Sequence, residues 1–422
     1  MDTLGDMASL FVATGSQSDQ QQQRVDASSN YGIANPRHQA TALKQPSPGE
    51  KKGRPSRLSK KPVFEVKFNF PDFTIGDAIG TKWDDGRPTT PEAQRYQIQG
   101  SDTCFRPLGA PVASGVFGEV SKAKRVRSES PAPPDPFVAI KETTRDDSLS
   151  ELPVHRYLPP QANIIGFLGT LGLHERRAAF AWAAGGSFAE ILHKLTQNAG
   201  GNAVLVDNAL CLLLSDVCSG FAHLHAHRVM HLDIKPANML INGDGTGVVG
   251  DFGEAHAFGE PPADNVPGWQ QIRHISHVRK TPGTIMYAAP EILCTPATAG
   301  PEADVWSFGL MAHQIITGNS FVDTTRFSED IYPLNIAGQL ALEAQEPGLY
   351  AKHAASRLAV TVPAGLPSAP QLHNMLTRTL VLDPHLRPSM DELRLDPMLS
   401  TFTYEIHQLR QFIAESVAAH GS

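Results

Sequence analysis

The chain has few cysteines and no long hydrophobic run, and both absences exclude classes of protein. Its 422 residues include four cysteines without CxxC or zinc-ligand spacing, which predicts free thiols in a reducing compartment rather than a disulfide framework. The longest apolar run, residues 209–214, is far shorter than the roughly 18 residues that a membrane span requires. The first fifteen residues carry two aspartates and neither Lys nor Arg, the wrong charge for a secretory signal. We therefore expect a protein of the cytoplasm, the nucleus or both, with no membrane span.

The chain also lacks the net positive charge that would hold it as a whole to nucleic acid or to an anionic membrane. Lys and Arg total 36 and Asp and Glu total 43, a formal net charge of −7 at pH 7, so any such contact must be local. Apolar residues make up 41% and charged residues 19%, which is the usage of a globular protein. The length suits two or three ordinary domains, or one two-lobed enzyme with a tail. No feature of the sequence indicates an oligomeric state.

Residues 1–62 are predicted to form a disordered tail, because Gln, Ser, Asp, Pro and Lys dominate without helical or strand periodicity. The tail ends in KKGRPSRLSKKP at residues 51–62, which holds six cationic residues and no acidic one. This basic cluster has three interpretations: a solvated linker, a nuclear import signal bound by an import receptor, or a weak contact with DNA resembling an AT-hook. Residues 63–102 begin with the alternating pattern VFEVKFNF and return to loop chemistry, which predicts a linker or a docking segment.

Beyond this segment, short β-type runs come first and longer helical patterns follow. Strands are predicted at residues 112–123, 137–141, 164–173 and 178–183. A short helix is predicted for ELPVHRYL, and longer helices for residues 207–225 and 301–318, the last of which starts with proline and ends with glycine. Strands followed by helices predict an α+β fold in two lobes.

Two segments in the strand region carry residue types suited to phosphate. VASGVFGEV places Gly115 and Gly118 in a strand-turn-strand context, where a missing Cβ lets backbone N–H groups approach an anion, although two glycines also suit any tight hairpin. VAIK ends in Lys141, and a lysine within an apolar strand needs an anionic partner because burying an unpaired ammonium is costly. Glu151 is the expected partner; the alternative is a surface lysine on an edge strand.

The segments MHLDIKPANMLI and VVGDFGEAH carry the strongest signal of chemistry, because a GDG turn between them can fold their aspartates together. Asp233 could accept a hydroxyl proton, and Lys235 could neutralise a transferring phosphoryl group. Asn238 and Asp251 offer the hard oxygen ligands that Mg²⁺ prefers. Such an arrangement suits phosphoryl transfer, where catalysis is mainly positioning and charge neutralisation.

These motifs resemble those of eukaryotic-type protein kinases of the serine/threonine branch. HLDIKPAN is similar to the catalytic loop of the family, and in particular to that of Mos-type kinases. DFG is similar to the magnesium-binding motif, and TIMYAAPE is similar to the end of the activation segment. DVWSFG and DPHLRP resemble later structural motifs, and all occur in family order. The resemblance implies a bilobal kinase domain at residues 103–402, with a small β-rich N-lobe at 103–184, a larger helical C-lobe at 185–402, and a C-terminal helix or tail at 403–422.

The resemblance also implies roles for single residues. Asp233 and Lys235 would be catalytic in transferring the γ-phosphate of ATP to Ser or Thr hydroxyls of protein substrates, and Asn238 and Asp251 would hold Mg²⁺. Lys141, paired with Glu151, would bind the α- and β-phosphates, while Glu291 with Arg387 would form a structural bridge and Asp304 would brace the catalytic loop. The further nucleotide contacts implied are Val112, Ala113, Gly115, Gly118, Val120, Ala139, Phe180 as gatekeeper, and Ala181 and Ala183 in the hinge.

Two departures from the family pattern bear on activity. Leu232 stands where the family usually has an arginine that receives an activation-loop phosphate, so we expect activity without loop phosphorylation of that kind. Ala113 replaces the first glycine of the nucleotide loop, a change expected to slow closure without preventing it. The rival interpretation is a pseudokinase scaffold that binds protein partners without catalysis. The presence of Lys141, Asp233 and Asp251 argues against that interpretation.

Overall fold

The computed structural model describes residues 95–419 except for nine gaps, and all the described residues belong to one compact unit. The basic cluster and the tail lie outside the described residues, as does most of the 63–102 segment, so the expectations for them stay predictions. The gaps are 116–117, 128–135, 144–150, 173–175, 263–267, 279, 295, 322–361 and 364.

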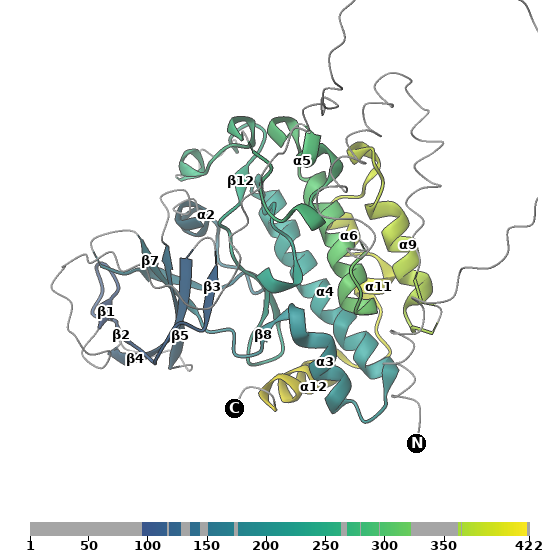
Figure 1. The fold of residues 1–422 in the computed structure, drawn as a ribbon, viewed down its shortest axis with the longest axis horizontal. Helices are drawn as coiled ribbons and strands as arrows, with labels where there is room; N and C mark the ends of the chain where they lie inside the picture. The colour runs from purple at the N-terminus through teal and green to yellow at the C-terminus, as the bar shows by residue number, and fades with distance from the viewer. Residues whose placement is uncertain are drawn as a thin grey trace, which may run out of the picture. The chain divides into compact units, whose positions relative to one another are not determined.

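Residues 96–181 contain an antiparallel sheet of seven strands (Figure 1). The strands run in the order β1-β2-β4-β5-β7-β6, and β3 pairs with β4 off this path. Their bounds are β1 (Tyr96–Gln97), β2 (Cys104–Pro107), β3 (Ala113–Gly115), β4 (Gly118–Arg127), β5 (Phe137–Thr143), β6 (Phe167–Thr170) and β7 (Arg177–Ala181).

β5 shows how the sheet acquires two different faces. Val138 and Ile140 point to one face, where they are buried in a small apolar core with Phe105. Successive side chains of a strand alternate in direction, so Ala139 and Lys141 point to the other face. One face of the sheet is therefore filled by its own core, and the other is available to a site.

One domain boundary and the length of one strand differ from the sequence-based prediction. β1 pairs Tyr96 with Phe105 of β2, so the predicted domain boundary at residue 103 lies inside the sheet. The strand predicted for residues 164–173 is shortened to β6, because the Ile165 N–H donates to the Val249 carbonyl at 2.9 Å and joins that residue to a different set of strands. A register shift at Gly169, which has a φ of 139°, marks the irregular part of β6.

The helices of the described chain follow the sheet, apart from α2 (Glu151–Tyr157), which lies between β5 and β6 and was predicted from ELPVHRYL. This order confirms the α+β fold with a β-rich N-lobe and a helical C-lobe. The remaining helices are α3 (Ile191–Asn198), α4 (Ala203–Ala226), α5 (Pro290–Cys294), α6 (Glu302–Thr317), α9 (Ala369–Thr379), α10 (Met390–Leu393), α11 (Pro397–Ser400) and α12 (Ile406–Ala418). Two small antiparallel sheets flank the loop after α4: β8 (Gly186–Ser187) with β10 (Met239–Ile241) and β11 (Gly247–Val249), and β9 (Val229–Met230) with β12 (His256–Ala257).

α4 is the central helix of the helical lobe. Among the described helices it alone is long and apolar enough to cross a membrane, but 78% of its apolar window is buried inside the domain, as in the core helix of a folded domain. It starts earlier than the predicted residue 207, because the side chain of Asn202 accepts the Leu205 N–H and caps the first turn. α6 follows the prediction, with Pro301 before it and Gly318, at a φ of 73°, after it.

α12 packs against the helical lobe as its last element (Figure 1). Its apolar stripe, which includes Leu409 and Ile413, is fully buried. Next to this stripe Arg410 forms an ion pair with Asp216 of α4 and donates to the Gly245 carbonyl at 2.9 Å. The helix is therefore joined both to α4 and to the turn between β10 and β11.

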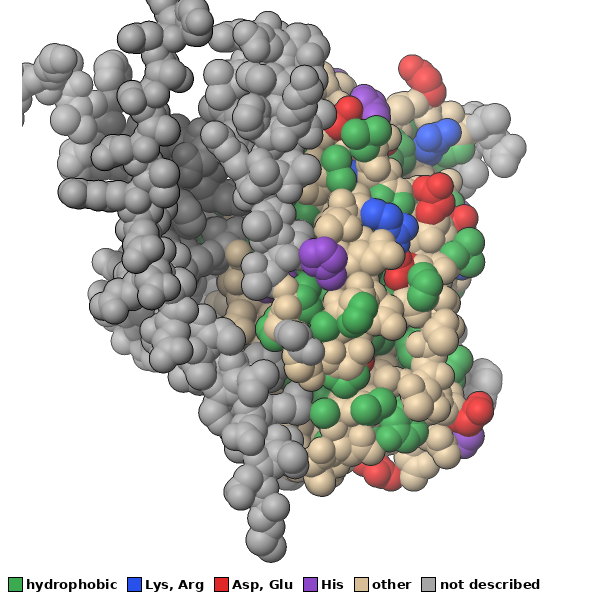
Figure 2. All heavy atoms as spheres, turned by 90° about the vertical axis from the view of Figure 1, so that its right-hand side faces the viewer, with side chains coloured by type: hydrophobic (Ala, Val, Ile, Leu, Met, Phe, Trp, Pro, Cys, Tyr) green, Lys and Arg blue, Asp and Glu red, His purple; other side chains and the backbone are tan. Residues whose placement is uncertain are grey.

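Figure 2 shows one face of the molecule with side chains coloured by type. On that face the acidic, basic and apolar side chains of the described residues are interspersed, and none of the three kinds gathers into a large patch among them. This surface therefore gives no indication of a docking site.

Candidate active site

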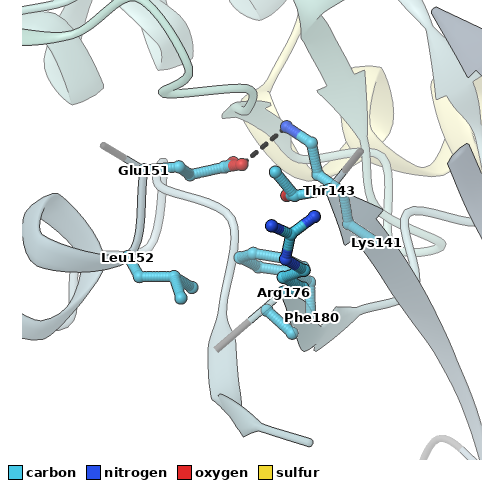
Figure 3. A pocket seen from close by; sticks show the side chains of 7 residues that line it. Lys141, Thr143, Glu151, Leu152, Arg176 and Phe180 are labelled. Atoms are coloured by element: carbon cyan, nitrogen blue, oxygen red, sulfur yellow. Dashed lines mark hydrogen bonds and ion pairs between the residues drawn. The ribbon is translucent and has the colours of Figure 1, made fainter. Parts of the chain in front are cut away.

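The central charged group of the site is Lys141 on β5. Its Nζ lies 2.6 Å from Glu151 Oε2 on α2 and 2.8 Å from Asp251 Oδ1 (Figure 3 shows the first of these contacts). Burial would lower the pKa of Lys141, but the charges of Glu151 and Asp251 outweigh burial and raise that pKa above its usual range. The ammonium therefore stays charged, and it joins the sheet, α2 and the DFG segment at one point.

Glu151 ties α2 to the same segment. Burial would raise its pKa, but Lys141 and then the imidazole of His155 outweigh burial and lower the pKa to about 2. Glu151 Oε2 accepts a hydrogen bond from Lys141 Nζ, and Oε1 accepts one from the backbone N–H of Phe252 at 3.3 Å. The orientation of α2 is thus linked to the backbone conformation next to Asp251.

A small hollow lies beside the Lys141–Glu151 pair (Figure 3). Besides these two residues, its lining consists of Thr143, Leu152, Arg176, Ala178 and Phe180. Val120 and Ala139, two of the predicted nucleotide contacts, do not line it. The hollow therefore shares Lys141, Glu151 and Phe180 with the predicted nucleotide site but covers only part of it.

The sheet register brings most of the predicted nucleotide contacts together. Ala113 pairs with Val120, and Val120 also pairs with Lys141, so these residues form one row across β3, β4 and β5. Ala139 pairs with Phe180 of β7 and belongs to the next row. Directly opposed residues of paired strands lie on one face. The remaining predicted contacts lie at the ends of these strands: Val112 before β3, Gly115 and Gly118 at the hairpin, and Ala181 and Ala183 at and after the end of β7.

Gly118 has a structural reason to be glycine that involves no ligand. Its φ is +143°, and a Cβ there would lie 2.0 Å from the carbonyl oxygen of Glu142 on the paired strand. A larger residue would therefore force β4 and β5 apart. The glycine pattern that suggested a phosphate loop is explained at this position by the sheet itself.

Asp233 is held in the loop between β9 and β10 by neighbours on both of its oxygens. The Thr284 hydroxyl donates to Oδ1 at 2.7 Å, and Lys235 Nζ donates to Oδ2 at 2.8 Å. Lys235 also donates to the Thr284 hydroxyl at 2.8 Å, which closes a ring of contacts. Burial would raise the pKa of Asp233, but Lys235 and the Thr284 hydroxyl outweigh burial and hold it below its usual value. Asp233 is thus a fixed, charged acceptor.

The backbone of this loop is strained and is braced from α6. Leu232 in this loop has a φ of 61°, and Asp251 of the DFG segment has a φ of 57°; such left-handed values cost free energy in residues with a Cβ. The buried carboxylate of Asp304 accepts the N–H of His231 at 2.8 Å and that of Leu232 at 2.9 Å. It also accepts His225 Nε2 at 2.8 Å. The predicted bracing role of Asp304 is confirmed.

His231 connects the catalytic loop to the DFG segment, a role that the sequence reasoning missed. The Asp233 N–H donates to its Nδ1 at 3.2 Å, so its Nε2 carries the proton and donates to the Gly250 carbonyl at 2.9 Å. The Gly250 N–H in turn donates to the Asn238 carbonyl at 3.0 Å. The sequence did carry a signal, because a histidine stands two positions before Asp233. We assigned that histidine to the catalytic-loop motif but predicted no contact for its side chain.

Asn238 and Asp251 fit a magnesium ion by the chemistry of their oxygens. Asn238 Nδ2 donates to the backbone carbonyl and to Oδ2 of Asp233, both at 2.8 Å, which leaves its Oδ1 as an acceptor. Within the described ranges, no group of three or more His, Cys, Asp or Glu side chains could hold a metal ion. Mg²⁺ usually binds one or two protein oxygens and completes its shell with phosphates and water, so an amide oxygen and a carboxylate are a suitable donor set.

Comparison with known proteins decides the family. Residues 108–399 match the protein kinase domain. The chain belongs to the protein kinase family. Members of this family generally use ATP and Mg²⁺.

Two relatives of this kinase domain come from a yeast and a plant. The MAP kinase kinase kinase wis4 of Schizosaccharomyces pombe is 28% identical over 222 residues, which cover 50% of this chain and 15% of wis4. The probable LRR receptor-like serine/threonine-protein kinase At5g10290 of Arabidopsis thaliana is 27% identical over 234 residues, covering 52% of this chain and 34% of the relative. The matched region is thus about a third or less of each relative's length.

The predicted bridge between Glu291 and Arg387 is present in the kinase domain. The guanidinium donates to Glu291 Oε1 at 2.6 Å and to Oε2 at 2.9 Å. Its Nε donates to the Val381 carbonyl at 2.7 Å, and the group lies over the ring of Trp306, 5.1 Å from the centroid. The bridge joins α5 to the segment before α10 across the buried end of α6.

Glu254 is a further acidic group at the kinase site that the sequence reasoning did not single out. Burial raises its pKa from 4.5 to about 7, and the charges of Asp233 and Asp251 add to this effect against the opposing charge of Arg273. In the sequence, its position directly after DFG was the feature that could have pointed to it. Glu254 therefore changes its charge near neutral pH.

Replacing Glu254 by glutamine is expected to stabilise the ligand-free protein at pH 8 but not at pH 4.5. Between pH 4.5 and about 7 the folded state keeps a proton that the unfolded state has released, so stability falls as the pH rises through this window. Because Glu254 is partly exposed, we expect a gain of about 1 kcal/mol, or roughly 2–4 °C in Tm. Thermal denaturation of both proteins at the two pH values is the measurement. An equal shift in Tm at both pH values would contradict the prediction.

Proposed function

We propose that this chain is an active serine/threonine protein kinase, which transfers the γ-phosphate of ATP to Ser or Thr hydroxyls of protein substrates in intracellular signalling. The observation that carries the proposal is the placement of Lys141 Nζ within 2.8 Å of both Glu151 and Asp251. Protein kinases require this ion pair and the DFG aspartate to be in place together. A pseudokinase scaffold has less support, because the three groups that such a scaffold usually loses, Lys141, Asp233 and Asp251, are all present, and Lys141 contacts Asp251.

Asp233 serves as the acceptor for the substrate hydroxyl. Its lowered pKa keeps it charged, which makes it a weak base that orients the hydroxyl and takes its proton as the O–P bond forms. Thr284 and Lys235 fix both carboxylate oxygens before substrate arrives, so little reorganisation accompanies the reaction. Lys235 adds a positive charge next to the place where the phosphoryl group passes.

Lys141 serves as the cation for the non-transferred phosphates. Its contacts with Glu151 and Asp251 fix the ammonium at the face of the sheet that carries Ala139 and Val120. Asn238 and Asp251 are the residues that would hold Mg²⁺, which would neutralise charge on the phosphates. The rows of small and β-branched side chains on β3, β4 and β5 would then cover the adenine.

Three observations support Ser or Thr on a protein as the acceptor. Lys235 and Thr284, two residue types that resemble those of the serine/threonine branch, both contact Asp233. Residues 284–291 end an activation segment, which small-molecule kinases of related fold generally lack. The relative from Arabidopsis thaliana is a serine/threonine-protein kinase by name.

The test is transfer of labelled γ-phosphate to a generic basic protein and to the chain itself, with ATP and Mg²⁺. We expect wild-type protein to label Ser and Thr, and Lys141→Met to reduce the rate about 100-fold because one charge at the phosphates is lost. Lys124→Met is the matched control, since Lys124 is an exposed residue of the neighbouring β4, and it should keep wild-type activity. Wild-type protein that binds ATP without transferring phosphate would favour the scaffold.

Removal of phosphate from the activation segment is expected to leave turnover within about twofold of the untreated protein, because Leu232 offers no charge for a phosphate to bind. The segment has other restraints: the Ala257 N–H donates to the Arg273 carbonyl at 2.7 Å, and β12 pairs with β9. Phosphatase treatment, checked by mass spectrometry, followed by the transfer assay is the measurement. Abolished activity would contradict the expectation.

A further inference from the structure

His155 lies inside the joint between α2, the sheet and the DFG segment. It follows Glu151 by four residues on α2, so the two side chains share one face of the helix. The residue is 8% exposed. Its ring contacts three phenylalanine rings, with centroid distances of 5.5 Å to Phe167, 4.9 Å to Phe180 and 4.7 Å to Phe252.

The polar end of this ring is not explained by the aromatic contacts. Nε2 of His155 is buried and has no hydrogen-bond partner among the described residues. It faces Glu151 Oε1 at 3.6 Å, slightly beyond hydrogen-bond length. A buried polar atom without a partner is costly, and a leucine would fill an aromatic cage without that cost. Among the described residues, Nε2 approaches the carboxylate that pairs with Lys141.

The two oxygens of Glu151 differ in how firmly they are held. Oε2 is fixed by Lys141 at 2.6 Å, whereas within the described part of the chain Oε1 has the long hydrogen bond from the Phe252 N–H, at 3.3 Å, and the imidazole at 3.6 Å. His155 also contributes to the lowered pKa of Glu151, after burial and Lys141. The imidazole therefore favours the charged carboxylate from the side opposite Lys141.

We propose that His155 is a positioning residue for the Lys141–Glu151 pair. With its proton on Nε2, the imidazole attracts Oε1 of Glu151 across 3.6 Å, so that Oε2 stays directed at Lys141. The same ring also packs on Phe252, with 4.7 Å between the centroids, but the proposal concerns the N–H of His155 and not this packing. The proposal deepens the proposed kinase function, since it concerns how the ammonium that binds phosphate is kept in place.

Two substitutions separate the donor from the packing. His155→Leu retains an apolar side chain in the cage and removes the donor, whereas His155→Gln retains an N–H at a similar reach and loses the ring. We expect His155→Leu to raise the Kd for ATP with Mg²⁺, measured by calorimetry, and the KM for ATP by about tenfold, with a smaller change in kcat. His155→Gln should stay within about threefold of wild type. The reverse order, with leucine near wild type and glutamine impaired, would show a packing role alone and overturn the proposal.

A double-mutant cycle on the ligand-free protein tests the same contact without any nucleotide. His155→Leu should lower Tm more, or raise it less, in the wild-type background than in a Glu151→Gln background, where the carboxylate is absent. Equal changes in the two backgrounds would overturn the proposal. The matched control is His193, an exposed histidine of α3, whose replacement by leucine should change Tm equally in both. If wild-type protein bound no nucleotide, the proposed function would fail while this cycle still decided the role of His155.

Discussion

Replacing Asp233 by asparagine is expected to lower phosphoryl transfer about a thousandfold while the protein stays folded. The amide has the same shape as the carboxylate but cannot take the proton of the substrate hydroxyl. It would also face Lys235 and the Thr284 hydroxyl, which now donate to the two carboxylate oxygens at 2.8 Å and 2.7 Å. The acceptor would thus lose both its charge and its fixed orientation.

The measurement is kcat for a basic protein substrate, together with the Kd for ATP and the Tm. We expect kcat to fall while the Kd stays within about threefold, because Asp233 acts on the acceptor hydroxyl and not on the nucleotide. Asp244→Asn is the matched control, since Asp244 is exposed in the turn between β10 and β11. Retention of more than about a tenth of wild-type turnover would contradict a role for Asp233 as proton acceptor.

Replacing Arg387 by leucine is expected to lower the free energy of unfolding by about 3–5 kcal/mol, because Glu291 would keep a charge without its partner in a largely buried site. The Arg387 side chain is 0% exposed. Beyond Glu291, it donates to the backbone carbonyls of Val381, Leu382 and Glu302. These carbonyls would lose their partners as well, which adds to the cost.

Chemical denaturation of the two proteins measures this loss. Arg394→Leu is the matched control, since Arg394 pairs with Asp391 on an exposed part of α10, and surface pairs contribute about 0–1 kcal/mol. Adding Glu291→Leu to Arg387→Leu should restore part of the stability, because the unpaired charge is removed. A loss below about 1 kcal/mol for Arg387→Leu would mean that the bridge is not a main support of the helical lobe.

The parts of the fold with strong local signals could be predicted from the sequence. Pro301 and Gly318 marked the ends of α6 because both act through their own backbone geometry. The start of α4 was missed because Asn202 caps it from outside the apolar pattern. The length of β6 was missed because Ile165 bonds to Val249, a partner remote in the sequence. Local chemistry was thus predictable, whereas competition between distant strands was not.

The candidate site shows the same division. The partnership of Lys141 with Glu151 followed from the cost of burying an unpaired ammonium, and the structure has that ion pair at 2.6 Å. Thr284, in contrast, reaches Asp233 across 51 positions of sequence, and no spacing rule predicts that contact. His155 could have been noticed from the sequence. It follows Glu151 by four residues on the same helix face, and packing alone does not require a polar side chain at that position. The significance of His155 depends on how close its Nε2 lies to Glu151 Oε1, which only the folded chain determines.

α12 shows that the folding unit of this protein is larger than the region recognisable by similarity. The family match ends at residue 399, whereas the helix that covers α3 and α4 runs over Ile406–Ala418. A fragment trimmed to the matched region would expose apolar surface and leave Asp216 without Arg410, so it should aggregate when expressed. Fragments for biochemistry should therefore extend beyond this helix, and any affinity tag at that end belongs after it.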